Sequence, residues 1–267
     1  MANNGSVSPA RRLVIRVSSR SLSFSTMEGR EVVYESYPLK SSISIAANMR
    51  EALQNVPLLS QPYGRLLVMV DSPVLMVPFN EFSEDTMEDY YRHAFTRTEQ
   101  QMVMHTVLSD LNSVALFAVS KDLRMVLQDA FSDVRFVAAL APLWLHLNQR
   151  SYTGPHNKLY VYFREKKLDV YSFAQNRFKF CNSYSFNSTE DAIYYILAAW
   201  KQLGMAAEHD ELFLTGSLAG NEELKDELEQ FIKRVFVINP VGEFNRVNVA
   251  QIPGIPYDLV IFYVKGL

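Results

Sequence analysis

Residues 158–184 read KLYVYFREKKLDVYSFAQNRFKFCNSY. Three runs in this stretch are rich in Val, Tyr and Phe, and two or three mostly polar residues separate each run from the next. Such runs predict strands, and links this short predict tight hairpin turns between them. The expected strands are 158–164, 167–173 and 177–184. The stretch therefore predicts an antiparallel three-stranded meander.

Helices and strands alternate after this meander. Ser188-x-x-Asp191 is a capping box, which predicts a helix that ends at Gly204. Leu224, Leu228, Phe231, Ile232 and Val235 fall on one face of a second predicted helix. The remaining apolar runs predict buried strands at 211–215 and 235–238 and, beyond a long loop over 239–256, a final strand at 258–264.

The first half of the chain repeats this order. Its predicted elements are strands 13–19, 21–27 and 31–39, helix 45–56, strand 65–70, helix 121–131 and strand 135–140. An additional segment, about 74–119, predicts a strand at 74–79, an acidic helix at 83–95 and a hairpin of 101–108 with 113–119. Residues 1–10 are small and polar and predict a frayed start.

The repeat predicts an α/β protein with two tandem lobes, each of order β-β-β-α-β-α-β. We expect one lobe over residues 1–150, with an α+β subdomain inserted at about 74–119, and a second lobe over 151–267. The polar segment 151–157, which contains Gly154 and Pro155, suits the boundary between them.

Composition limits the function classes. The 26 basic and 29 acidic residues are mixed along the chain and give a net charge of −3, which disfavours nucleic acid as a partner. Neither a signal peptide in 1–12 nor an apolar run long enough to span a bilayer is evident, so we expect a cytoplasmic protein without a membrane span. Cys181, the single cysteine, lies among aromatic residues, and we expect a buried, inert thiol.

Two tandem lobes that each begin with a three-stranded meander resemble the ribonuclease-H-like duplication of the actin-like ATPase superfamily. The sequence is also similar to an uncharacterised bacterial family, a domain of unknown function, to which the same fold is assigned. The resemblance implies an Asp-x-Gly phosphate loop in the first hairpin, a second Asp- and Gly-rich phosphate loop in the second lobe, and a Gly-rich adenosine motif. Glycines let backbone N–H groups approach phosphates, and the aspartates hold magnesium.

The first phosphate loop is degenerate in this sequence. Arg16 stands where the metal-binding Asp is expected, Ser18 stands where the Gly is expected, and Ser19 follows. We expect Arg16, and likewise Arg20 at the turn, to be solvated, because arginines at hairpin turns usually are.

The second phosphate loop is equally degenerate. Tyr162 replaces its first Asp, Arg164, Glu165 and Lys166 replace its glycines, and only Asp169 survives. We expect Arg164 to be solvated as well. Loss of these groups removes the positioning and charge neutralisation that phosphoryl transfer needs, so no catalytic residue is predicted.

The adenosine motif is better preserved. Thr215, Gly216 and Ser217 follow Leu214, and Gly220 and a helix from Asn221 come next. A strand that ends in Gly before a helix is common α/β turn chemistry, so a structural role is favoured over a nucleotide contact.

No metal site or cofactor is predicted. The five histidines are scattered, and the acids at 81–89 suit a helix N-terminus.

These patterns favour a non-catalytic actin-like scaffold that binds a protein or peptide. The alternative, which the surviving Asp169, Thr215 and Gly216 motivate, is a diverged ATPase or kinase that uses Asp169 and further carboxylates not assigned to positions in the sequence. A ribonuclease-H-like nuclease ranks last, because the first strand of each lobe has no carboxylate. Asn239-Pro240 resembles the actin-like component of type IV pilus machinery, which acts as a protein-binding platform.

Overall fold

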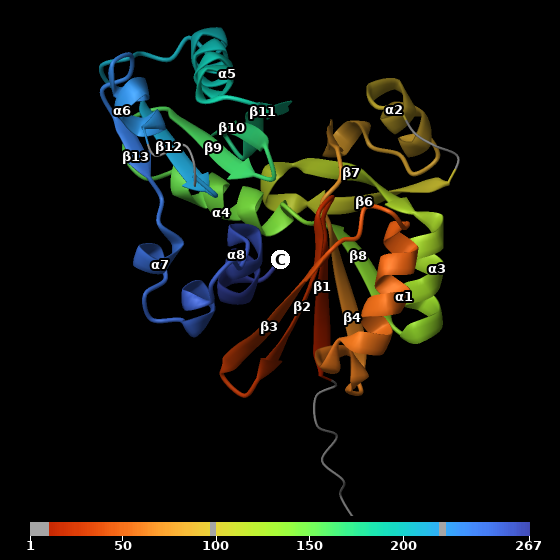
Figure 1. Ribbon diagram of the computed structural model, residues 1–267. Coiled ribbons are helices and arrows are strands. Elements are labelled where there is room, and N and C mark those ends of the chain that lie inside the picture. Colours follow the sequence, from red (N-terminus) through yellow and green to blue (C-terminus); the bar gives the residue numbers. More distant parts are fainter. Residues whose placement is uncertain (1–10, 97–99, 219–222) are drawn as a thin grey trace, which may run out of the picture. The chain divides into compact units, whose positions relative to one another are not determined.

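The computed structural model describes residues 11–96, 100–218 and 223–267 (Figure 1). Residues 1–10, Gly220 and Asn221, for which the sequence suggested a frayed start and a helix N-terminus, lie outside this range. The chain separates into two compact units. Unit 1 comprises the described residues up to Val107 together with Val114–Ala141, and unit 2 comprises Leu108–Ser113 together with the described residues from Pro142 onward. The domain limits expected from the sequence, 1–150 and 151–267, stay a prediction.

Unit 1 is built on a mixed five-stranded sheet of order β3-β2-β1-β4-β8. Its strands are β1 (Arg12–Val17), β2 (Ser21–Glu28), β3 (Glu31–Pro38), β4 (Arg65–Val70) and β8 (Val134–Ala138). The first three are antiparallel because short turns join them, whereas β4 and β8 run parallel to β1. The helices α1 (Ile45–Asn55) and α3 (Lys121–Ala130) each begin at a serine whose hydroxyl accepts a backbone N–H bond.

A second sheet, of order β5-β7-β6, lies between β4 and α3 in the chain and belongs to unit 1 except for Leu108 and Ser113 at two of its strand ends. Its elements are β5 (Val74–Pro78), α2 (Met87–Ala94), β6 (Gln101–Leu108) and β7 (Ser113–Ser120). Val77, Tyr91, Val103 and Leu116 form its core. Short 3-10 turns, η1 (Pro57–Ser60), η2 (Phe79–Glu81) and η3 (Ser109–Leu111), complete the connections of this half of the chain.

Helix α2 begins later than the sequence suggested. The expected start was Ser83, but the helix begins at Met87. Thr86 donates both its N–H (3.3 Å) and its hydroxyl (3.4 Å) to the Ser83 carbonyl, which closes a separate turn. Short hydroxyl side chains form such local bonds in competition with a helix.

Unit 2 repeats the sheet of unit 1, with order β11-β10-β9-β12-β13. Its elements are α4 (Ala141–Ser151, with Ala141 in unit 1), β9 (Lys158–Arg164), β10 (Lys167–Ala174), β11 (Arg177–Ser185), α5 (Thr189–Gln202), β12 (Glu211–Gly216), α6 (Leu224–Glu229), β13 (Val235–Val237), α7 (Pro240–Glu243), η4 (Asn248–Gln251) and α8 (Tyr257–Lys265). Val17 pairs with Leu22 and Val70, and Phe163 pairs with Leu168 and Gly216 in the same way. The expected β-β-β-α-β-α-β order is therefore present in both units.

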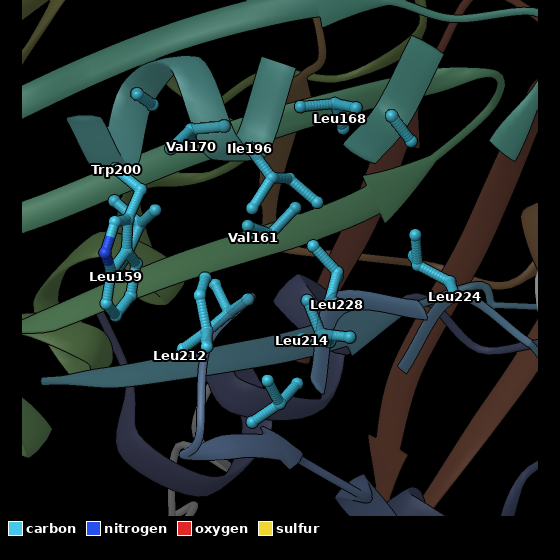
Figure 2. Packing of buried hydrophobic residues seen from close by; sticks show 14 of the residues in the cluster. Leu159, Val161, Leu168, Val170, Ile196, Trp200, Leu212, Leu214, Leu224 and Leu228 are labelled. Carbon is cyan, nitrogen blue, oxygen red and sulfur yellow. The ribbon is translucent and has the colours of Figure 1, made fainter. Parts of the chain in front are cut away.

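The core of unit 2 lies between one face of its sheet and the helices α5 and α6. Figure 2 shows Leu159 and Val161 of β9 and Leu212 of β12 together with Ile196 and Trp200 of α5. Alternate residues of β9 and β12 point to this face, as the period of a strand requires. Complete burial of one such side chain contributes about 1.5–3 kcal/mol.

The expected final strand at 258–264 is wrong, because these residues form helix α8. Leu259, Val260, Ile261 and Phe262 are all buried, so the run has no polar face whose period would identify a helix. The start and stop signals were present: Pro256 precedes the helix, and Gly266, with φ of 85°, follows it.

One side chain expected to be buried, that of Phe231, is exposed. Phe231 is 56% exposed because α6 ends at Glu229, so Phe231 lies beyond the helix. Cys181, on β11, is exposed as a residue, but burial of its thiol raises the pKa of that thiol to about 12, which agrees with the expectation of an inert thiol. Among the described helices, none is long and apolar enough to cross a bilayer.

Candidate functional site

Three residues singled out in the sequence, Arg16, Ser18 and Ser19, lie at the first hairpin of unit 1. The Arg16 guanidinium contacts Asp71 Oδ2 at 3.2 Å, and the two side chains are only 5% and 4% exposed. Asp71 directly follows β4, the parallel neighbour of β1, so the pair forms where two adjacent strands end. The expectation that Arg16 is solvated is therefore wrong. Arg20, at the turn, is exposed as expected.

The Ser18 hydroxyl forms hydrogen bonds with backbone groups of this hairpin. Its oxygen accepts bonds from the N–H groups of Arg20 (3.3 Å) and Ser21 (3.0 Å), and it lies 3.0 Å from the Ser21 carbonyl. Backbone N–H groups of such a loop are the donors that would hold a phosphate. Two of them are already engaged within the hairpin.

The corresponding hairpin of unit 2 carries a second buried ion pair. Arg164 Nε and Nη2 lie 2.5 and 3.3 Å from the two carboxylate oxygens of Asp169, and the Arg164 and Asp169 side chains are 11% and 2% exposed. The turn consists of Glu165 and Lys166, both with positive φ (44° and 63°), as a type I′ turn requires. The expectation of a solvated Arg164 is wrong, because the strand pairing of β9 with β10 brings it onto Asp169.

Residues of the adenosine-like motif are used by the sheet itself. A Cβ on Gly216, where φ is +93°, would lie 2.3 Å from the Phe163 carbonyl oxygen and 2.7 Å from Cδ2 of the Tyr162 ring. Thr215 is fully buried and donates its hydroxyl to the Ile238 carbonyl at 3.4 Å. The Ser217 N–H donates to the Phe163 carbonyl at 2.9 Å. These contacts explain why Thr215, Gly216 and Ser217 are present without invoking a bound nucleotide.

The structure thus gathers the candidate residues in two places. Arg16, Ser18 and Ser19 lie on the first hairpin of unit 1. Tyr162, Arg164, Asp169, Thr215, Gly216 and Ser217 lie on or next to the adjacent strands β9, β10 and β12 of unit 2. Asp71 was missed in the sequence, although a carboxylate directly after a buried parallel strand is a usable signal.

A further polar cluster of unit 2 was also missed. Glu243 Oε1 lies 3.0 Å from both His146 Nε2 and Arg150 Nη1, and the Tyr257 hydroxyl donates to Glu243 Oε2 at 2.5 Å. Desolvation raises the pKa of Glu243, but the bonds from His146 and Tyr257 and the charges of His146 and Arg150 outweigh it, and the pKa lies below its usual value. Nothing in the sequence links groups so far apart in the chain.

An arginine engages the carboxylate beside each of the two degenerate phosphate loops. Both carboxylates, Asp71 and Asp169, contact a guanidinium, and carboxylates are the protein ligands that magnesium usually takes. Among residues 11–96, 100–218 and 223–267, no three His, Cys, Asp or Glu side chains gather in a way that could hold a metal ion.

Comparisons with known proteins agree on the fold. A family model described as a protein of unknown function (DUF3822) matches residues 3–235. The crystal structure of a Bacteroides thetaiotaomicron protein with actin-like ATPase fold and unknown function is 30% identical, with a TM-score of 0.81 over 94% of this chain and 95% of that chain. A chain of the PilM–PilN type IV pilus biogenesis complex is 12% identical, with a TM-score of 0.58 over 96% of this chain and 98% of that chain. The comparison with curated proteins finds no match.

These findings confirm the actin-like ATPase fold and the resemblance to a family of unknown function that the sequence suggested.

Proposed function

We propose that this chain, which belongs to the DUF3822 family of proteins of unknown function, is a non-catalytic actin-like scaffold that binds a protein or peptide partner. The observation that carries the proposal is the pair of buried ion pairs, Arg16 with Asp71 and Arg164 with Asp169, at the two hairpins where a phosphate would bind. At each hairpin the arginine neutralises the carboxylate, so neither charge is left for a phosphate or a metal ion.

The electrostatics of these pairs argue against phosphoryl transfer. That reaction depends on magnesium and fixed donors that neutralise the charge on the transferred group. At both hairpins the carboxylate that a metal would need contacts an arginine. Releasing either charge into a buried site is costly, because breaking such a pair costs about 3–5 kcal/mol.

Steric contacts around Gly216 support the same conclusion. Ligands of parallel α/β sheets bind beyond the carboxyl ends of the strands. At that end of β12, the Tyr162 ring lies so close to Gly216 that a Cβ could not be added without movement. The glycine therefore makes room for Tyr162 and the Phe163 carbonyl within the fold.

Partner binding is supported by a structure of the same fold. The PilM–PilN type IV pilus biogenesis complex contains a chain with this fold, so the fold serves in at least one protein complex. A fold without working phosphate loops keeps its surfaces, and these are available for recognition.

Calorimetric titration with ATP and ADP, with and without magnesium, tests the non-catalytic part of the proposal. We expect no binding at millimolar nucleotide and no phosphate release. Magnesium-dependent ATP turnover that Asp169→Asn abolishes would overturn the proposal and support the alternative, a diverged ATPase.

The scaffold part is tested with a purified partner. A protein captured by the tagged chain should, after separate purification, form a complex of fixed stoichiometry in analytical ultracentrifugation. Its affinity should be the same with and without magnesium and ATP. A partner whose binding requires nucleotide would contradict the proposal.

A further inference from the structure

The strand β11 ends the sheet of unit 2 and presents one backbone edge away from it. The Phe186 N–H donates to the Lys166 carbonyl at 3.2 Å, so the backbone N–H of Phe186 points toward β10. Because alternate residues of an antiparallel strand face the same side, Cys181, Ser183 and Ser185 turn their backbone groups outward. Within the described part of the chain, no strand continues the sheet on this side. Asn182 Oδ1 accepts from the Ser183 N–H at 2.9 Å and covers one of the outward amides.

Three tyrosines lie beside this edge. The rings of Tyr184, on β11, and Tyr195, on α5, stack with centroids 4.5 Å apart and planes 14° apart. Tyr194 meets Tyr195 edge-on at 5.5 Å and is 69% exposed. We call Tyr184, Tyr194 and Tyr195 the tyrosine cluster. Such an exposed aromatic group offers flat apolar area and ring faces that attract cations.

The charges around the strand differ between its two ends. Glu190 and Asp191 lie one helical turn before Tyr194 and Tyr195 on α5, so their carboxylates neighbour the tyrosine cluster. Glu190 is exposed and its carboxylate forms a hydrogen bond with Ser188, and Asp191 accepts the Asn187 N–H at 3.0 Å, so both carboxylates also take part in the helix cap. The other end of β11 carries Arg177 and Lys179, both exposed. The face that carries the tyrosine cluster thus favours a positive group, whereas Lys167, which pairs with Ser185, lies on the opposite face of the sheet. The other end of β11 disfavours a positive group.

We infer that the outward edge of β11 and the tyrosine cluster together form a docking surface for an extended protein segment with a lysine or arginine. The backbone of the segment pairs with β11 between Cys181 and Ser185, a length of about 14 Å. Its basic side chain lies against the tyrosine cluster beside Glu190, and its residues near Lys179 are neutral or acidic. This inference rests on the proposed scaffold function and names the surface and the partner chemistry.

A phage-displayed library of random 12-residue peptides, selected on the full chain, tests the inference. Enriched peptides should contain Lys or Arg among β-branched residues. By fluorescence anisotropy, Tyr194→Ala and Glu190→Gln should each weaken their binding about 2- to 5-fold. Ser183→Pro, which places a proline on the outward edge without removing a bond to β10, should weaken it by about 10-fold or more. Phe231→Ala, at another exposed aromatic site of unit 2, should leave it unchanged.

Folding of each variant is checked by tryptophan fluorescence during urea unfolding. Tyr194→Ala removes an exposed ring and keeps the test valid if Ser183→Pro destabilises the unit. Failure to enrich any peptide, enrichment of acidic peptides, or equal binding by wild type, Tyr194→Ala and Ser183→Pro would each overturn the docking surface. Peptides that bind elsewhere would leave the scaffold function standing, whereas magnesium-dependent ATP turnover would refute that function independently.

Discussion

Replacing Arg164 with methionine should destabilise unit 2 by about 3–5 kcal/mol, because it removes the positive charge from a buried carboxylate and keeps most of the side-chain volume. The Asp169 side chain is only 2% exposed, and Arg164 Nε lies 2.5 Å from it. Both tryptophans of the chain, Trp144 and Trp200, lie in unit 2, so their fluorescence reports its unfolding. In urea, the midpoint should fall by about 1–2 M.

An exposed ion pair of the same length provides the control. Lys225 Nζ and Glu229 Oε1 are also 2.5 Å apart in unit 2, but their side chains are 39% and 40% exposed. Lys225→Met should therefore cost no more than about 0.5 kcal/mol. Equal costs for the two variants would refute the argument from burial.

Three further outcomes follow from contacts within unit 2. Gly216→Ala should destabilise the unit by more than about 3 kcal/mol in urea, because of the contact with the Phe163 carbonyl, whereas Gly204→Ala, with positive φ but open space, should cost about 1–2 kcal/mol. Glu243→Gln should lower the free energy of unfolding by about 1–3 kcal/mol at pH 7. Because the pKa of Glu243 is lowered in the folded state, the stability difference between wild type and variant should be complete above the usual carboxyl pKa and should disappear as the pH falls through the folded pKa. Burial raises the pKa of Tyr160 to about 12, so wild-type stability should fall as the pH rises from about 10 to 12, and Tyr160→Phe should lessen that loss.

Local signals in the sequence were enough for most of the fold. Apolar alternation, short turns and serine caps depend on neighbouring residues, so the meanders and helices α1, α3 and α5 were predicted close to where they lie. The repeat of element order then indicated the duplicated α/β fold. The run at 258–264 was mistaken for a strand because it is buried on all sides, and burial on all sides removes the period.

The candidate site divides in the same way. The sequence by itself determined which residues replace the aspartates and glycines of the phosphate loops, because that is a matter of identity and spacing. Only the tertiary structure decided what those residues do: it brings Arg16 to Asp71 across two parallel strands, and it buries Arg164 against Asp169 in a hairpin. An arginine is solvated or buried according to the strands that surround it, and that environment arises only when segments distant in the chain pack together.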